Sequence, residues 1–233
     1  MKILALDTTS GSCSVALNDG GRLTEQFVAA ERDHTRRLLP MVDRVLAEAG
    51  LKLAQLDALA VSRGPGSFTG LRIAISSVQG LAFAAGLPVI PVSSLAALAA
   101  GARRKHPEWH AGTIVAALDA RMQQVYWGAY SPAAPAESIV PEAVEDPAEA
   151  TASLSAAGIE GALYGAGPGW HYPELAAAPV AAIDLDCPIH ARDLAELALP
   201  LAQAGKAVSA EQLEPVYLRN EVTWKKRQKI RPQ

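Results

Sequence analysis

The sequence predicts an α/β protein built from two similar halves. An apolar strand, KILALD, opens the chain and ends at Asp7, and a second such strand, TIVAALD, ends at Asp119. Each is followed at similar spacing by another strand, and strand patterns then alternate with helical ones over short links. Repetition of this kind indicates an internal duplication, and strands alternating with helices are typical of an α/β fold.

In the first half, alternating apolar residues indicate strands, and apolar residues three or four apart indicate helices. Asp19-Gly20-Gly21 predicts a hairpin, and Gly50 ends the first helix. The expected elements are, in order, strands at 2–6, 12–18 and 22–29, a helix at 34–49, a strand at 56–62, a helix at 70–85, a strand at 87–92 and a helix at 94–104.

The second half begins after a loose segment, KHPEWHAG, and we place the boundary near residues 105–112. The domains are then 1–107 and 108–223, followed by a basic tail at 224–233. Proline and alanine make 131–148 a loop, and Gly165-Ala166-Gly167-Pro168-Gly169 predicts a turn. The other expected elements are strands at 113–117, 124–130 and 162–165 and helices at 147–157 and 190–204.

The link at Gly64-Pro65-Gly66 is richer in glycine than an ordinary strand-to-helix connection requires. Ser67 or Thr69 can cap the helix that follows, whose first turn carries free N–H groups and the positive end of the helix dipole. Such a turn can receive a phosphate or a carboxylate. Alternatively, the glycines only let strand and helix pack closely. The turn is not a Walker loop, because no GK[ST] follows it.

The helix at 70–85 is apolar on several faces and carries only one charge, Arg72. A helix of this kind must be covered on most sides. Small residues leave a flat face where another helix could approach closely, which favours an interface between helices; the alternative is an internal helix that touches only its own sheet. The small residues are Ala74, Ser76, Ser77, Gly80 and Ala84.

Composition indicates a cytoplasmic protein. With 233 residues, half of them hydrophobic, the chain can bury a sizeable core. No apolar run reaches the length that a bilayer requires, and MKILALD contains an acid where a signal peptide would stay apolar. Cys13 and Cys187 lie far apart, so we expect reduced cysteines; Cys13 has no paired base in view, which argues against a nucleophile.

Basic character is confined to the tail. The last ten residues, WKKRQKIRPQ, hold five basic groups and no acid. The rest of the chain then has 16 basic and 24 acidic groups, a balance of −8 against −3 for the whole chain. Such a tail suits contact with RNA phosphates or an acidic partner, and it equally suits a solvated chain end.

Two halves that each open as strand, acidic turn and strand resemble the duplicated ribonuclease H-like fold of actin, Hsp70 and the sugar kinases, the ASKHA fold. In that superfamily the acidic turns hold nucleotide phosphates and magnesium. The resemblance implies a vestigial nucleotide- or anion-binding set, consisting of Asp7, Thr8, Thr9, Ser10, Gly64, Gly66 and Ser67.

Several motifs resemble those of the TsaB family, also called YeaZ, accessory subunits of the bacterial machinery that forms threonylcarbamoyladenosine in tRNA. The resemblance covers most of the chain and is strongest before residue 130. The motifs are LALDTTS, His34 at the first long helix, SRGPGSFTGLRI, LDARMQQVY and PVYLRNEV. Among these motifs, the segment SRGPGSFTGLR is highly specific for this family.

The resemblance implies a non-catalytic subunit that pairs with the catalytic paralogue TsaD and supports transfer of a threonylcarbamoyl group to N6 of adenosine 37 in tRNAs reading ANN codons. The ATPase TsaE would join the pair, tRNA would contact the complex, and the chain alone would form a homodimer. The TsaD interface would lie on the two long helices, with His34, Leu38, Met41, Val42, Val45, Gly70, Arg72, Ile73, Ala74, Ser77, Gly80 and Leu81. No cofactor is expected, apart from weakly bound ATP or ADP at that interface.

The residues argue against independent catalysis. After Asp119 come Ala120, Arg121 and Met122, which offer a phosphate no glycine or hydroxyl, and we expect Arg121 to pair with a local acid. The resemblance places the metal-binding histidines of the catalytic paralogue at Ser94 and Leu98, and leucine cannot bind a metal.

Other readings remain open. His106 and His110 are four residues apart, but Pro107 interrupts the helix that would put them on one face. The turns at 64–66 and 165–169, together with Asp7, would suit an independent ATPase or phosphotransferase. A glycoprotease-type peptidase would require a metal site or a nucleophile with an oriented base, and the sequence shows neither.

Overall fold

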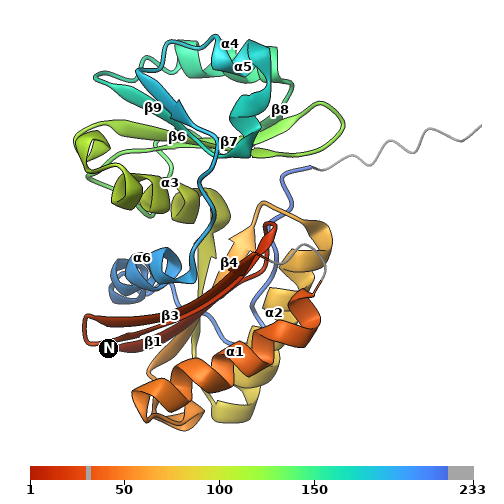
Figure 1. Cartoon of the computed structure of the whole chain (residues 1–233), viewed down its shortest axis with the longest axis vertical. Coiled ribbons are helices and arrows are strands. Elements are labelled where there is room, and N and C mark those ends of the chain that lie inside the picture. The colour runs from red at the N-terminus through yellow and green to blue at the C-terminus, as the bar shows by residue number, and fades with distance from the viewer. Residues whose placement is uncertain (30–32, 220–233) are drawn as a thin grey trace, which may run out of the picture.

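A computed structural model describes residues 1–29 and 33–219 and contains two lobes, each built on a five-stranded mixed sheet (Figure 1). The expected basic tail at 224–233, and residues 220–223 of the expected second domain, lie outside the described residues. The two sheets confirm the α/β class.

The sheet of the first lobe has the order β3-β2-β1-β4-β5. β1 pairs antiparallel with β2 and parallel with β4, and β4 pairs parallel with β5. The carboxyl ends of these three parallel strands therefore meet at one edge of the sheet. The strands are β1 (Lys2–Asp7), β2 (Ser12–Asp19), β3 (Arg22–Ala29), β4 (Ala58–Gly64) and β5 (Val89–Ser93).

The second sheet repeats this topology. Its order is β10-β9-β6-β7-β8. Read from the other end, this is the order of the first sheet with five added to each strand number, and the antiparallel and parallel pairings match as well. The Gly-Pro-Gly sequence after β4 recurs after β9, at 167–169. These matches confirm the internal duplication. The strands are β6 (Thr113–Asp119), β7 (Val125–Tyr130), β8 (Ala143–Glu145), β9 (Leu163–Ala166) and β10 (Ala182–Asp184).

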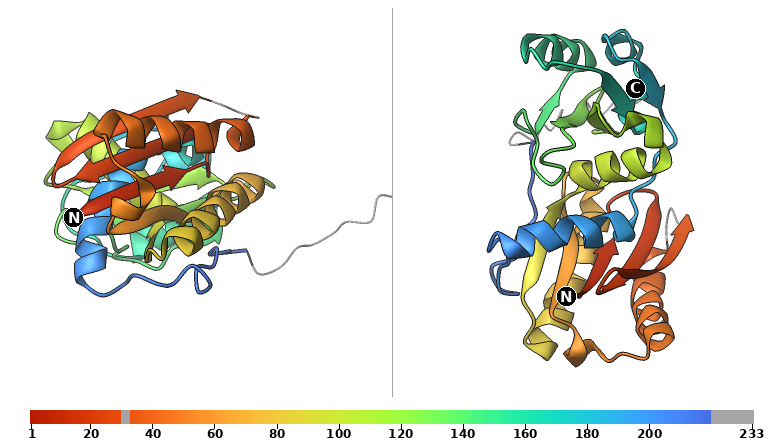
Figure 2. Two further views of the ribbon diagram at one scale, coloured as in Figure 1. Left: turned by 90° about the horizontal axis from the view of Figure 1, so that it is seen from below. Right: turned by 90° about the vertical axis from the view of Figure 1, so that its left-hand side faces the viewer.

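Helices cover both faces of each sheet. The outer face of the first sheet carries α1 (His34–Ala49) and α2 (Phe68–Ala85), and that of the second carries α4 (Pro147–Ala156) and α5 (Pro173–Ala176). Between the sheets lie α3 (Ser94–Lys105) and α6 (Ala191–Gln203), as Figures 1 and 2 show. Short 3₁₀ turns complete the list at Leu53–Gln55, Pro107–Trp109 and Pro168–His171.

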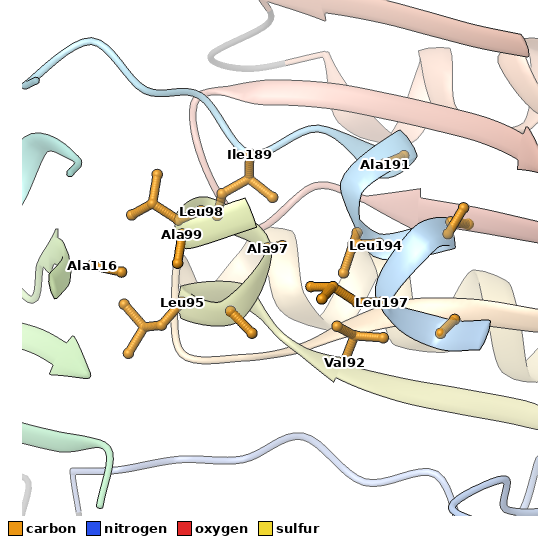
Figure 3. Close-up of a cluster of buried hydrophobic side chains, with 14 of the residues drawn as sticks. Val92, Leu95, Ala97, Leu98, Ala99, Ala116, Ile189, Ala191, Leu194 and Leu197 are labelled. Atoms are coloured by element: carbon orange, nitrogen blue, oxygen red, sulfur yellow. The ribbon is translucent and has the colours of Figure 1, made fainter. Parts of the chain in front are cut away.

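The two central helices exchange lobes. α3 comes from the first half but packs on β6 and β7, whereas α6 comes from the second half and packs on β1 and β2. Their side chains form one core between the sheets, with Leu98 turned toward Ala116 and Leu197 toward Ala97 (Figure 3). A paired hydrogen bond between the Arg104 guanidinium and the buried Asp193 carboxylate, at 2.8 and 2.9 Å, joins the same two helices.

Local sequence explains the helix ends. The Ser67 hydroxyl accepts a hydrogen bond from the N–H of Gly70 at the start of α2, and the Ser93 hydroxyl accepts bonds from two N–H groups at the start of α3. Gly50 and Gly86 take the left-handed conformation that ends α1 and α2. The predicted bounds of α1 are confirmed without change.

Two expectations need correction. β8, α5 and β10 were not predicted, because three or four residues do not show a period. α2, with 18 residues and mean hydropathy 1.2, is long and apolar enough to cross a membrane by those criteria alone, so the expectation that no run reaches that length was wrong. Since α2 connects two neighbouring strands and buries one face on their sheet, it occupies the place of a core helix.

Candidate functional site

The first acidic turn is closed inside the lobe. Asp7, Thr8 and Thr9 are buried, and Asp7 Oδ1 accepts hydrogen bonds from Thr9 Oγ1 at 2.6 Å, Thr9 N at 3.3 Å and Ser62 Oγ at 2.5 Å. Burial raises the pKa of Asp7, although these hydrogen bonds oppose the shift. The turn thus brings together the residues the sequence placed there, but the hydroxyls of Thr8 and Thr9 bond inside the protein, to the Gly70 carbonyl oxygen and to Asp7.

The glycine-rich turn packs against the same segment. A Cβ atom at Gly66 would lie 2.7 Å from the Thr9 carbonyl oxygen, and one at Gly64 would lie 2.8 Å from the carbonyl oxygen of Val216. Gly64 also has a φ of 106°, which favours glycine. The geometry therefore matches the close-packing alternative, since protein backbone occupies the space beside both glycines. Ser67 is exposed and Ser10 is half-buried.

The second acidic turn is tied down by side chains. Asp119 Oδ1 accepts hydrogen bonds from Arg121 N at 2.9 Å and from Tyr172 OH at 3.2 Å, and Arg121 Nη1 lies 3.6 Å from Asp119 Oδ2. The expected pairing of Arg121 with a local acid is confirmed. Residues 121–123 all have positive φ, between 56° and 61°, a conformation that non-glycine residues adopt with strain. Bulky side chains thus surround the position where a second phosphate loop would lie.

Arg219, the last described residue, stabilises the second acidic turn through hydrogen bonds. Its Nη2 atom donates hydrogen bonds to Gln124 Oε1 at 2.7 Å and to the carbonyl oxygens of Ala120 at 3.1 Å and Arg121 at 3.5 Å. Three residues earlier, Val216 N donates to the carbonyl oxygen of Arg63 at 2.8 Å. The last described segment therefore passes from the first lobe to the second beside both turns.

The other candidate catalytic groups are enclosed. Ser94 and Leu98 are fully buried in the core between the sheets. Burial is the main cause that raises the pKa of the Cys13 thiol to about 11, and burial with the neighbouring Asp184 raises that of Cys187 to about 12. Neither thiol is therefore activated as a nucleophile.

One set of residue types has the composition of a hydrolase triad but not its geometry. Ser14 Oγ donates to Glu25 Oε1 at 2.9 Å, and His190 Nδ1 lies 3.1 Å from the same oxygen. The serine thus bonds to the carboxylate and not to the histidine, and it is fully buried. A triad requires the histidine to bond to the serine, so this set joins α6 to β2 and β3 and does not activate a nucleophile.

The face of α1 predicted to meet a partner packs inside the lobe instead. Its apolar side chains lie on the first sheet, because a single apolar stripe on a helix cannot cover its own sheet and a partner at the same time. Gly70 and Ala74 of α2 are buried in the same way. The prediction that these side chains form a contact surface was therefore wrong for His34, Leu38, Met41, Val42, Val45, Gly70 and Ala74.

The opposite face of α2 is exposed along its whole length. Arg72 and Gly80, both predicted, lie on it, and Ile73, Ser77 and Leu81 lie half-buried at its edges. Phe83 is 74% exposed and Phe68 is 57% exposed. We call this surface the outer face of α2 and define it by Phe68, Arg72, Ser76, Gly80, Phe83 and Ala84.

Aromatic residues mark both ends of the outer face, and small residues lie between them. At one end the Arg72 guanidinium lies 3.8 Å from the Phe68 ring centre, and Arg72 Nε donates to Tyr217 OH at 3.3 Å. A shallow groove begins there and includes Thr35 of α1. Sequence reasoning missed the two phenylalanines and Tyr217, because an all-round apolar helix does not reveal which of its faces stays open.

The comparisons with known proteins agree with this geometry. The family model described as "TsaD: tRNA N6-adenosine threonylcarbamoyltransferase" matches residues 28–183. The proteins named "tRNA threonylcarbamoyladenosine biosynthesis protein TsaB" of Haemophilus influenzae and Escherichia coli are 41% and 40% identical to this chain. Each alignment covers 97% of this chain, with 97% and 98% of the relatives.

A solved structure, "YeaZ from Pseudomonas aeruginosa", has a TM-score of 0.82 at 43% identity. It covers 93% of this chain and 99% of the YeaZ chain. Similarity in sequence and in fold thus extends over nearly the full length of both proteins, and it confirms the ribonuclease H-like, actin-like fold class. On these grounds the chain belongs to the TsaB family.

Proposed function

We propose that this protein acts in the biosynthesis of threonylcarbamoyladenosine in tRNA as a non-catalytic subunit that docks on a TsaD-type catalytic subunit. The observation that carries the proposal is the outer face of α2, which is uncharged apart from Arg72 and exposes two large aromatic side chains. Exposed apolar surface of this kind typically marks a protein interface.

Gly80 supports close docking on this face. It lies inside α2, where glycine destabilises a helix by about 0.5–1 kcal/mol relative to alanine. Apart from its chain neighbours and the nearby backbone of α2 itself, no atom of the described residues comes within 4 Å of the position of its missing Cβ. The fold itself thus gives no reason for the glycine. A partner helix that approaches α2 closely would give one.

The closed state of both acidic turns supports the non-catalytic role. Phosphate binding at the first turn would have to displace the packed Thr9 backbone, and at the second it would have to displace the braces from Tyr172 and Arg219. These features disfavour an independent ATPase or phosphotransferase. They leave unaffected the proposal that ATP or ADP binds weakly where the two subunits meet.

The remaining parts of the proposal follow from family membership. A TsaE-type ATPase joins the pair, tRNA is bound by the complex, and the reaction takes place in the cytoplasm. The product carries the threonylcarbamoyl group on N6 of adenosine 37 in tRNAs that read ANN codons. In the absence of the TsaD-type subunit, the outer face of α2 pairs with a second copy of this chain.

The experiment is reconstitution with purified TsaD-type and TsaE-type subunits and unmodified tRNA. Modified nucleoside should form only when this chain is present, and the isolated chain should not turn over ATP with Mg²⁺. Gly80→Arg should weaken pairing with the TsaD-type subunit by roughly 30-fold or more, the scale of an interface hot spot, because it puts a long charged side chain where the face now has none.

Ala152→Arg is the matched control, since Ala152 is a small exposed residue in the middle of α4. It should pair and support modification like the unchanged protein. Full pairing by a folded Gly80→Arg variant would refute the docking face. ATP turnover that Asp7→Ala abolishes would refute the non-catalytic role.

A further inference from the structure

Three side chains that can bind metals meet where the two halves of the chain join. They are His106 at the end of α3, Asp184 at the end of β10 and Cys187 in the link to α6. His106 Nε2 lies 2.6 Å from Asp184 Oδ2, and Cys187 Sγ lies 3.2 Å from the same oxygen. Nitrogen, oxygen and sulfur donors thus converge within 4.8 Å of one another.

Neighbouring groups orient these donors. Glu108 Oε1 lies 3.1 Å from His106 Nδ1, the ring nitrogen that faces away from the cluster, and Asp186 N donates to Asp184 Oδ1 at 2.9 Å. The His106 ring also stacks on the buried Trp109 ring, with centres 4.0 Å apart and planes at 15°. A carboxylate on the outer nitrogen of a histidine is the usual second layer of a metal site, because it fixes the ring and its protonation.

The ammonium group of Lys105 would compete with a metal ion for the Asp184 carboxylate. This group lies 2.8 Å from Asp184 Oδ2 and donates to the carbonyl oxygen of Asp186, also at 2.8 Å. The Lys105 side chain is 45% exposed, so it can turn into solvent and free the carboxylate. Cys187, in contrast, is buried.

We propose that His106 Nε2, Asp184 Oδ2 and Cys187 Sγ bind one Zn²⁺ or a divalent ion of similar preference. Zinc favours this combination of imidazole, carboxylate and thiolate in tetrahedral geometry. Binding replaces the thiol proton and any proton on His106 Nε2, both of which leave to solvent, and it moves the Lys105 ammonium away from Asp184. Three protein ligands leave the fourth position to water.

The site would join segments that are about 80 residues apart in sequence. His106 ends the helix that the first half contributes to the central core, and Cys187 precedes the helix contributed by the second half. A bound ion would therefore stabilise the exchange of α3 and α6 between the lobes. The inference is independent of the proposed docking function, since this cluster lies on neither α1 nor α2.

Cobalt titration of the metal-free full-length chain tests the inference. One equivalent of Co²⁺ should produce the near-ultraviolet charge-transfer absorption of a cobalt–thiolate bond, and Zn²⁺ should remove it by displacement. Cys187→Ser should lose the band, and Glu108→Gln should weaken binding by about 10- to 100-fold, the range for second-layer partners. Lys105→Met should bind more tightly, because the competing ammonium is gone.

Cys13→Ala and His110→Ala are the matched controls, being the other cysteine and the histidine nearest to His106 in sequence, and both should leave the band unchanged. Circular dichroism checks that each variant is folded. A missing band in the unchanged protein, or one that survives Cys187→Ser, would overturn the site and leave only a network of ion pairs. Loss of the band in His110→Ala would overturn the ligand set.

Discussion

Asp7 concentrates its hydrogen bonds on one oxygen of its carboxyl group. Oδ1 accepts bonds from Thr9 and Ser62, whereas Oδ2 is buried without a partner among the described residues. Burial raises the pKa of the group above its usual value of 3.8, and the hydrogen bonds and the charge of His190 only partly offset the shift. An ionised carboxylate at this position therefore destabilises the folded state.

The first prediction concerns Asp7→Asn. Because the folded-state pKa is raised, the folded protein holds its proton to higher pH than the unfolded chain does, and stability falls as the pH rises from about 3.8 through the folded-state pKa. The variant should therefore gain unfolding free energy relative to the unchanged protein across that window, by at most about 1.4 kcal/mol per pH unit. Urea denaturation at a series of pH values measures the difference.

Ser62→Ala provides the control for this prediction. It removes a hydrogen bond that lowers the pKa of Asp7, so its destabilising effect should grow with pH when Asp7 is present and should not vary with pH in the Asp7→Asn background. A difference between Asp7→Asn and the unchanged protein that stays constant with pH would contradict the prediction.

At the scale of elements, α1 and α2 show what the sequence could and could not predict. The spacing of apolar residues predicted the bounds of α1, because a period depends only on neighbouring residues. Which face of α2 stays open depends on where the sheet lies, and its all-round apolar pattern does not contain that information. For α1 the apolar stripe is clear, but the stripe alone does not say whether it packs on a sheet or on a partner, so Leu38 was assigned to the interface although it lies in the core of the first lobe.

The candidate site was likewise predictable only in part. The strand ends that bring Asp7 and Gly66 together follow from the order of strands and turns. The cluster of His106 with Asp184 and Cys187 joins residues about 80 positions apart, and β10, which positions Asp184, is only three residues long. No local pattern could indicate that His106 lies beside the other two residues. The short spacing of Asp184 and Cys187 in DLDCP, at 184–188, was the available signal for that pair.

The second prediction compares two glycines of α2. A Cβ at Gly70 would lie 1.8 Å from the Thr8 carbonyl oxygen, so Gly70→Ala must push α2 away from the end of β1. A Cβ at Gly80 meets nothing within 4 Å, so Gly80→Ala should only gain helix propensity. We expect Gly80→Ala to raise the free energy of unfolding by about 0.5–1 kcal/mol and Gly70→Ala to lower it by 1–3 kcal/mol or more, on the order of an overpacked core.

Thermal denaturation of the two variants, at protein concentrations where the chain is monomeric, measures this contrast. Because the substitutions are chemically identical and lie in the same helix, they serve as controls for each other. Equal effects of the two changes, or destabilisation by Gly80→Ala, would show that the outer face of α2 is covered within the isolated chain.

On the scale of the whole molecule, the exchange of α3 and α6 couples the lobes. The core between the sheets takes side chains from β1, β4 and β5 of the first lobe and from β6 and β9 of the second. The last described segment adds a polar link across the same junction, because Val216 bonds to Arg63 of the first lobe and Arg219 bonds to Gln124 of the second. Neither lobe can lose its sheet without exposing the helix that the other half contributed, so we expect the two to unfold together.

The last prediction tests this coupling from one lobe to the other. Leu38 lies on α1, beyond the first sheet, whereas the tryptophans of the described chain, at 109, 127 and 170, all lie in the second half. In a Trp224→Phe background, which removes the tail tryptophan, Leu38→Ala should destabilise the protein by about 2–5 kcal/mol. It should lower the urea midpoint seen by tryptophan fluorescence as much as the midpoint seen by far-ultraviolet circular dichroism.

Leu154→Ala, in the outer core of the second lobe, is the reciprocal control and should also move both signals together. If Leu38→Ala lowers the circular dichroism midpoint and leaves the fluorescence midpoint in place, the lobes unfold independently and the shared core does not couple them.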